Sequence, residues 1–142
     1  MKREKGLFTL QPSFVIVTLR GMHEDSEAPE DLRTRTKRFG LAAVAAFVKI
    51  PTSIQGQVMS RQMLRSATSV GAHYREACRA RSDAEFISKM EGGLQELDET
   101  AYWLELLTES GTFSAAAAHQ LHEEAEELIR IFVAIVRKRK GT

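Results

Sequence analysis

Four arginines at helical spacing are the side chains of this sequence best suited to binding chemistry. Arg61, Arg65, Arg75 and Arg79 follow one another at steps of four, ten and four residues. On an α-helix, these steps place all four on one stripe of the surface. A guanidinium is a planar fork that binds two oxygens of a phosphate or carboxylate at once, so the stripe predicts a surface for a phosphate-bearing or acidic partner. The alternative is a row of ion pairs with glutamates of the same protein.

The stripe itself carries no aromatic side chain on which nucleic-acid bases could stack. Stacking on aromatic rings and hydrogen bonds to base edges are the usual means of recognising bases, whereas contacts to phosphates depend on charge. A nucleic acid bound at these arginines is therefore expected to be recognised by charge and shape more than by sequence.

Two histidines and two glutamates form the only other cluster that suggests chemistry. His119, His122, Glu123 and Glu126 lie within two helical turns, where a pair three residues apart could share a divalent ion. Di-iron bundle proteins instead supply a Glu-x-x-His motif from each of two helices, and that motif does not occur in this sequence. The cluster is therefore interpreted as an exposed polar face, and no metal or other cofactor is expected.

No catalytic set is visible in the sequence. A serine or cysteine nucleophile needs a nearby base that a third group orients, but Ser66, Ser69 and Cys78 have only His73 close by in the chain. No glycine-rich loop suited to cradling phosphates is present either. The sequence therefore predicts a protein that is not an enzyme.

Charge is strongly segregated along the chain, although the net charge is only +1. Residues 31–81 sum to +8, residues 82–127 to −11 and residues 128–142 to +5. Two interpretations stay open. A basic helix could pair along its rim with Glu96, Glu99 and Glu105 of an acidic neighbour, each exposed pair contributing about 0–1 kcal/mol. Alternatively, one basic face remains unpaired and attracts an anionic partner such as nucleic acid.

The elements that must position these side chains are four helices with short turns between them. All three prolines lie at or before residue 51, so long helices are permitted after it. Start and stop signals predict one helix from Glu30 or Asp31 to just before Pro51, one from Thr52 or Ser53 to about Ala80, one from the capping box at Ser82 to Gly111, and one from Thr112 or Ser114 to Lys140. Four such helices predict an all-α, antiparallel up-and-down bundle.

The apolar spacing predicts which faces are buried. In the second helix, burial is expected for Ile54, Val58, Leu64, Ala67, Val70, Gly71, Tyr74 and Cys78. Tyr102 and Trp103 are expected to anchor the third helix in the core or between subunits. Gly71 suggests a close approach of two backbones, and the Gly92-Gly93 pair suggests a tight crossing or a slight bend, because glycine costs a helix interior about 1 kcal/mol relative to alanine.

The first thirty residues differ in composition from the rest of the chain. Residues 1–30 are expected to be a poorly ordered extension of a domain formed by residues 31–140. The apolar run near the N-terminus is interrupted by Gln11-Pro12-Ser13 and is shorter than a membrane span, so neither export nor membrane insertion is expected. The single Cys78 cannot form an internal disulfide, which is typical of a reducing compartment and favours a cytoplasmic location.

Three runs of this sequence, LRSATSVGAHYREACRARS, AEFISKM and DETAYWLELL, resemble the four-helix-bundle proteins encoded in intervening sequences of bacterial 23S ribosomal RNA genes. The resemblance extends from about Asp31 to Lys140 and implies a homopentamer packed as a barrel, with no assigned catalytic residues. It also implies a relation to accessory proteins of diversity-generating retroelements, which bind a reverse transcriptase and nucleic acid through basic surfaces. By that resemblance, the expected contact residues are Arg61, Arg65, Arg75, Arg79 and Arg81.

Two functions from different classes are consistent with these observations. The first is a non-catalytic, oligomeric four-helix bundle that binds structured RNA or a protein–nucleic-acid assembly through its basic surface. The second is a purely structural or protein-interaction scaffold whose arginines pair with its own glutamates and which binds no nucleic acid.

Overall fold

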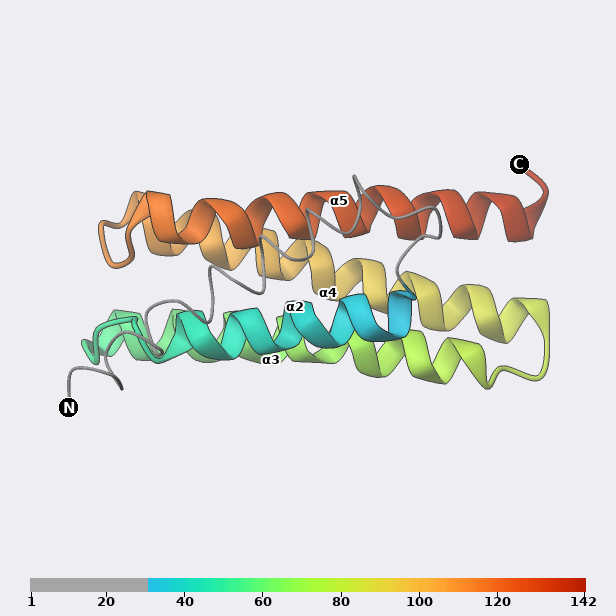
Figure 1. Ribbon diagram of the computed structural model, residues 1–142, viewed down its shortest axis with the longest axis horizontal. Helices are drawn as coiled ribbons and strands as arrows, with labels where there is room; N and C mark the ends of the chain where they lie inside the picture. The colour runs from blue at the N-terminus through green and yellow to red at the C-terminus, as the bar shows by residue number, and fades with distance from the viewer. Residues whose placement is uncertain (1–30) are drawn as a thin grey trace.

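The computed structural model describes residues 31–142, and all regular elements in this part of the chain are α-helices. The helices are α2 (Leu32–Phe47), α3 (Ile54–Cys78), α4 (Asp83–Glu109) and α5 (Ala115–Lys140). Consecutive helices run antiparallel and lie side by side (Figure 1). Contacts between α2 and α5 close the bundle. The predicted all-α, up-and-down four-helix fold is confirmed, and the expected extension over residues 1–30 lies outside the described residues.

Local capping chemistry fixes where the helices begin and end. The Ser82 hydroxyl accepts a hydrogen bond from the Glu85 amide at 3.1 Å, and the Glu85 carboxylate accepts one from the Arg81 amide at the same distance. Gly111 follows α4 with φ of +73°, the left-handed conformation that glycine adopts without steric cost. The predicted ends are therefore correct to within three residues.

The side of α3 that faces the core differs from the prediction at three positions. Ile54 and Val58 are 84% and 57% exposed, and Cys78 is also exposed, so the expected burial of these three side chains is wrong. Gly56 and Ser60 occupy the buried positions of the first turns instead. Because one residue advances an α-helix by about 100°, Ile54 and Val58 lie two residues and about 200° from the buried Gly56.

Glycines permit two close helix contacts that were predicted from the sequence. A Cβ atom added at Gly93 would lie 2.8 Å from Cε2 of Phe132, a fully buried ring on α5. A Cβ atom added at Gly71 would lie 3.3 Å from the Thr36 hydroxyl on α2. Gly93 is therefore placed at a tight crossing of α4 and α5, and Gly71 at a close approach of α3 to α2.

Helix α2 leaves apolar side chains uncovered. Leu41, Val44 and Val48 are 53%, 44% and 56% exposed, and their spacing of three and four residues places them on one stripe. On α4, Tyr102 is 55% exposed, so it does not lie in the core of this chain, whereas Trp103 packs partly buried against the core. Within residues 31–142, no helix is both long enough and apolar enough to cross a membrane.

Candidate nucleic-acid interface

The five predicted contact residues all lie on α3 or on the turn that follows it. Arg61 and Arg65 are exposed on α3, and Arg79, the C-cap of this helix, and Arg81 are exposed in the turn before α4. Arg75 is partly buried and lines a groove between α3 and the neighbouring α2. The spacing of the arginines thus produces a basic surface along α3.

Arg65 differs from the other arginines because it is paired with α4. Its Nη2 donates to Glu99 Oε2 at 2.6 Å, and its Nη1 lies 3.6 Å from Glu96 Oε2. The Arg65 side chain is 53% exposed, so water screens the pair and it contributes at most about 1 kcal/mol to stability. The predicted row of ion pairs between α3 and α4 is therefore formed at this position.

The remaining arginines of the surface are not neutralised in this way. Among residues 31–142, no carboxylate pairs with Arg61, Arg75, Arg79 or Arg81. Two carboxylates that could have reached the surface are engaged elsewhere. Glu76 lies 3.0 Å from Lys89 Nζ, and this hydrogen bond and the lysine charge lower the pKa of the Glu76 carboxyl group. Glu105 lies 3.7 Å from His122 Nε2 instead of approaching α3.

A shallow groove of about 360 Å³ runs between α2 and α3 beside the basic surface. Arg75 and Lys37 contribute positive charge to its wall, while Leu41 and Val44 contribute apolar surface. Gly71 also lines the groove, at a close approach of α3 to Thr36 of α2. The arrangement offers cationic donors for oxygen ligands next to an apolar strip.

A buried ion pair that the sequence pattern did not reveal fixes the position of α2 against α5. Arg35 is 5% exposed, and its Nε donates to Glu124 Oε1 at 2.7 Å while Nη2 lies 3.1 Å from Glu127 Oε1. Burial lowers the pKa of Arg35, but hydrogen bonds and attraction to the two carboxylates outweigh it and raise the pKa above its ordinary value. The spacing places Arg35 on the core-facing side of α2, four residues before the buried Phe39, but it does not identify the carboxylates that pair with it.

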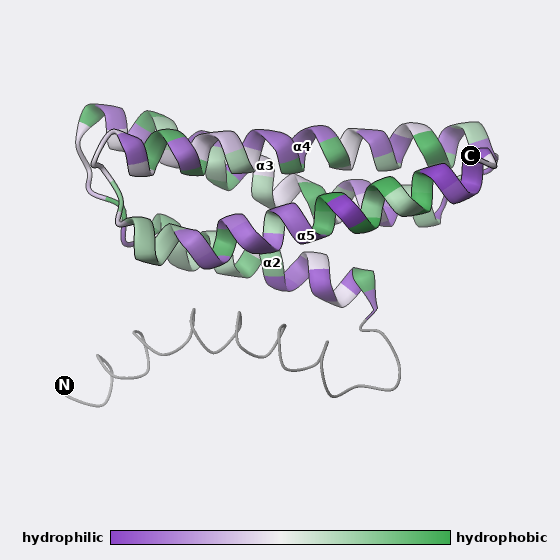
Figure 2. Cartoon of the chain, turned by 90° about the horizontal axis from the view of Figure 1, so that it is seen from above, coloured by the Kyte–Doolittle hydropathy of each residue, from purple (hydrophilic) through white to green (hydrophobic). Residues whose placement is uncertain are grey.

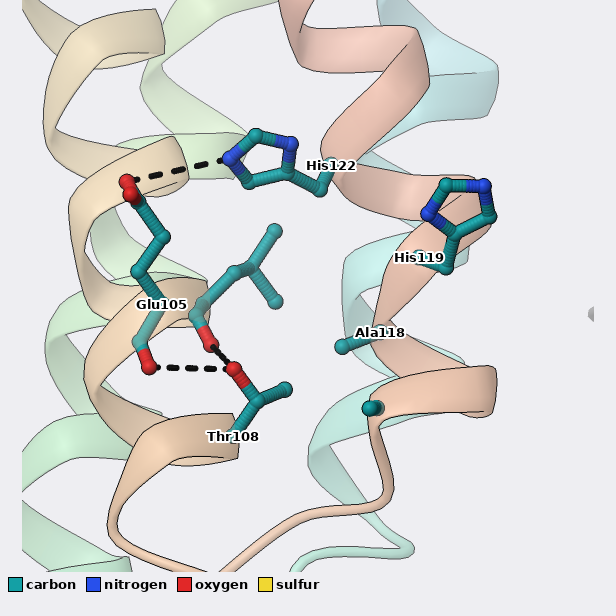
Figure 3. Close-up of a pocket in the computed structure, with 7 residues that line it drawn as sticks. Glu105, Thr108, Ala118, His119 and His122 are labelled. Carbon is teal, nitrogen blue, oxygen red and sulfur yellow. Dashed lines mark hydrogen bonds and ion pairs between the residues drawn. The ribbon is translucent and has the colours of Figure 1, made fainter.

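The helix α5 histidines pair with separate carboxylates. His122 points across to Glu105 on α4, whereas His119 points away from it (Figure 3). His119 Nε2 lies 3.3 Å from Glu123 Oε1 on its own helix. Within the described part of the chain, no three histidine, cysteine, aspartate or glutamate side chains converge in a geometry that could hold a metal ion. Of the four residues in this cluster, His119 is exposed, whereas His122, Glu123 and Glu126 are partly buried.

Residues 31–134, which form nearly the whole bundle, match the family described as 23S rRNA-intervening sequence protein. The chain belongs to this family. A similar structure is the 1.70 Å crystal structure of a protein of unknown function from Bacteroides thetaiotaomicron VPI-5482, which is described as a member of the S23 ribosomal protein family. Its sequence is 32% identical to that of this chain. The match covers 75% of this chain and 99% of that chain, with a TM-score of 0.69. A search of curated proteins gave no match.

Membership of the intervening-sequence protein family confirms the resemblance seen in the α3 and α4 motifs. Those motifs lie within the matched residues, and the similar structure shares the helical fold. The relation to retroelement accessory proteins stays a prediction. The family assignment therefore establishes ancestry and architecture, and the role of the basic surface has to be argued from its geometry.

Proposed function

We propose that this intervening-sequence protein is a non-catalytic bundle that binds structured RNA, alone or within a protein–RNA assembly, through the basic surface of α3. One observation carries the proposal: Arg61, Arg75, Arg79 and Arg81 have no carboxylate partner within residues 31–142, although α4 is rich in acidic residues. Unpaired arginines at a surface attract polyanions, and their forked donors match phosphate oxygens.

RNA phosphates suit the shape of this surface. The arginines are spread along a helix, so they can reach several phosphates of one backbone. Each neutralised phosphate releases condensed counterions, so the affinity is expected to fall steeply as the salt concentration rises. Because the stripe presents no aromatic ring for stacking, structure and charge of the RNA are expected to matter more than its sequence.

The proposed binding unit is a homo-oligomer, with a pentameric barrel as the expected form. Leu41, Val44 and Val48 support this proposal because they form an exposed apolar stripe on α2 that a second copy could cover. Ile54 and Val58 add exposed apolar area near the start of α3. A repeated basic surface in a closed ring would also multiply the phosphate contacts of each assembly. The single, exposed Cys78 is consistent with the proposed cytoplasmic location.

The decisive experiment compares RNA binding by wild type and by the double variant Arg75→Gln/Arg79→Gln. Fluorescence anisotropy with a labelled RNA hairpin between 50 and 200 mM salt gives both the affinity and its salt dependence. If each arginine neutralises one phosphate, the log–log salt slope should become shallower by about 1.4 to 1.8. The matched control is Lys49→Gln/Arg130→Gln, which removes two exposed charges away from the stripe. Light scattering checks that the mass of the assembly is unchanged.

The alternative function, a scaffold without nucleic-acid binding, is favoured by the Arg65 pairs with α4. Under that alternative, wild type does not bind the hairpin at low salt. The double variant would then lower stability or dissociate the assembly instead of weakening RNA binding. Absence of binding by the intact wild-type oligomer would therefore reject the RNA proposal.

A further inference from the structure

The C-terminal turn of α5 lies against the first turns of α4, at the same end of the bundle as the turn between α3 and α4 (Figure 1). Arg139 Nη1 donates to Asp83 Oδ1 at 3.0 Å, and its guanidinium lies 3.9 Å from the centre of the Phe86 ring. Lys140 Nζ donates to Glu91 Oε1 at 2.8 Å. These contacts bring a basic segment that is remote in sequence beside the last arginines of the α3 surface.

The acidic side chains at this end of the bundle already have partners. Residues 75–91 and 137–140 contain eight lysines and arginines but only four aspartates and glutamates. Asp83 and Glu91 pair with α5, Glu76 pairs with Lys89, and Glu85 accepts from a backbone amide. Four exposed side chains have no carboxylate partner in the part of the chain that the structure describes: Arg79, Arg81, Arg137 and Lys138.

Helix capping does not explain this excess of positive charge. The carbonyls of Arg137 and Lys138 accept backbone hydrogen bonds from Thr142 and Gly141 at 2.9 and 3.2 Å, so the last turn of α5 is closed without its basic side chains. Two helices end and two begin at this end of the antiparallel bundle, so their macrodipoles oppose one another. The uncompensated charges are therefore available to a partner.

We infer that these four side chains, which we name the basic end, bind the phosphate backbone of RNA and extend the α3 surface around the tip of the bundle. The inference rests on the proposed function and assigns the α3–α4 turn and the C-terminal turn of α5 to the contact. Figure 2 shows the last turn of α5 as hydrophilic. Large exposed apolar side chains of the described residues all lie elsewhere, so the tip lacks the apolar anchors with which a peripheral helix enters a lipid surface.

The test is the double variant Arg137→Gln/Lys138→Gln, measured by anisotropy with the same RNA hairpin. For single strands, each neutralised phosphate contributes about 0.7 to the slope of log affinity against log salt concentration, so losing two contacts makes the slope shallower by about 1.4. Raising the salt from 50 to 200 mM should then reduce the affinity of wild type about 7-fold more than that of the variant. The control Lys49→Gln/Arg130→Gln removes the same charge and should keep a steeper slope than the basic-end variant. Circular dichroism and light scattering confirm that helicity and mass are retained.

Three outcomes separate this inference from the proposed function. A flattened slope in the basic-end variant, with a smaller effect in the control, supports the inference. If wild type binds the hairpin and the basic-end variant behaves like the control, Arg137 and Lys138 are not contacts and the extension of the surface onto α5 is rejected, while the α3 proposal stands. If wild type binds vesicles containing phosphatidylserine but not RNA, both the inference and the RNA proposal are overturned.

Discussion

Replacing Arg35 by methionine tests how the short α2 is held in the bundle. The substitution keeps much of the apolar stem but removes the guanidinium that neutralises Glu124, whose side chain is 8% exposed. Glu127, whose Oε1 lies 3.1 Å from the same guanidinium, loses this ion pair as well. Removing one partner of a buried ion pair typically costs about 3–5 kcal/mol, because the remaining charge stays desolvated. We expect Arg35→Met to lower the free energy of unfolding by this amount.

Arg65→Met is the matched control, because it makes the same substitution in an ion pair of nearly the same length. Arg65 lies 2.6 Å from Glu99 and Arg35 lies 2.7 Å from Glu124, but the Arg65 side chain is 53% exposed against 6% for Arg35. The exposed pair is expected to contribute about 1 kcal/mol or less. The two variants therefore differ mainly in burial.

The assay is urea unfolding followed by circular dichroism, at one protein concentration for all variants. The double variant Arg35→Met/Glu124→Met removes both buried charges and should recover at least half of the loss, because apolar replacements of a buried pair are often nearly neutral. Equal losses for Arg35→Met and Arg65→Met would refute the argument that burial determines the cost. A double variant as unstable as Arg35→Met would show that lost packing, and not charge, is responsible.

Two further predictions concern the core. Gly93→Ala should lower the free energy of unfolding by up to about 2 kcal/mol, because overpacking against the buried Phe132 ring costs about 1–3 kcal/mol and the gain in helix propensity returns about 1 kcal/mol. Gly92→Ala places its new methyl group against the partly exposed His73 ring and should lower stability less. Equal urea midpoints for the two variants would contradict the packing argument. Burial is the largest of the effects that raise the pKa of Tyr74 to about 12, followed by a hydrogen bond and charge interaction with Cys78 and by the charge of Asp31. The stability that the neutral Tyr74 side chain contributes is therefore present below pH 10 and is lost as the pH rises toward 12. Tyr74→Phe should therefore show a smaller fall in melting temperature over that range, and an unchanged fall would be evidence against it.

Local signals made most of the fold predictable from the sequence. The capping box at Ser82 and the stop at Gly111 depend on side chains and backbone within a few residues, so one segment of sequence suffices to locate them. Gly93 was also predictable, because a glycine in a helix interior is costly unless another element comes close.

The buried ion pair and the phase of α3 were harder to predict for a physical reason. Arg35 and Glu124 lie at core-facing positions of two helices separated by 89 residues, and their burial is tolerated only because they meet. Ile54 and Val58 are apolar, yet no described element covers the face on which they lie. Both cases depend on which neighbour packs against a helix, and that information is not contained in the periodicity of a single segment.

Charge composition alone also could not decide whether the α3 arginines are paired. The +8 of residues 31–81 and the −11 of residues 82–127 would allow extensive neutralisation between α3 and α4. An ion pair, however, requires two charges at the same level and on facing sides. Of the five predicted contact arginines, Arg65 meets this condition within the described residues, whereas the acidic side chains near the others pair with Lys89, Arg139 and Lys140. The segregated charge is therefore left exposed by the packing, and the location of that exposed charge makes RNA binding a more specific hypothesis than the net charge of +1 would suggest.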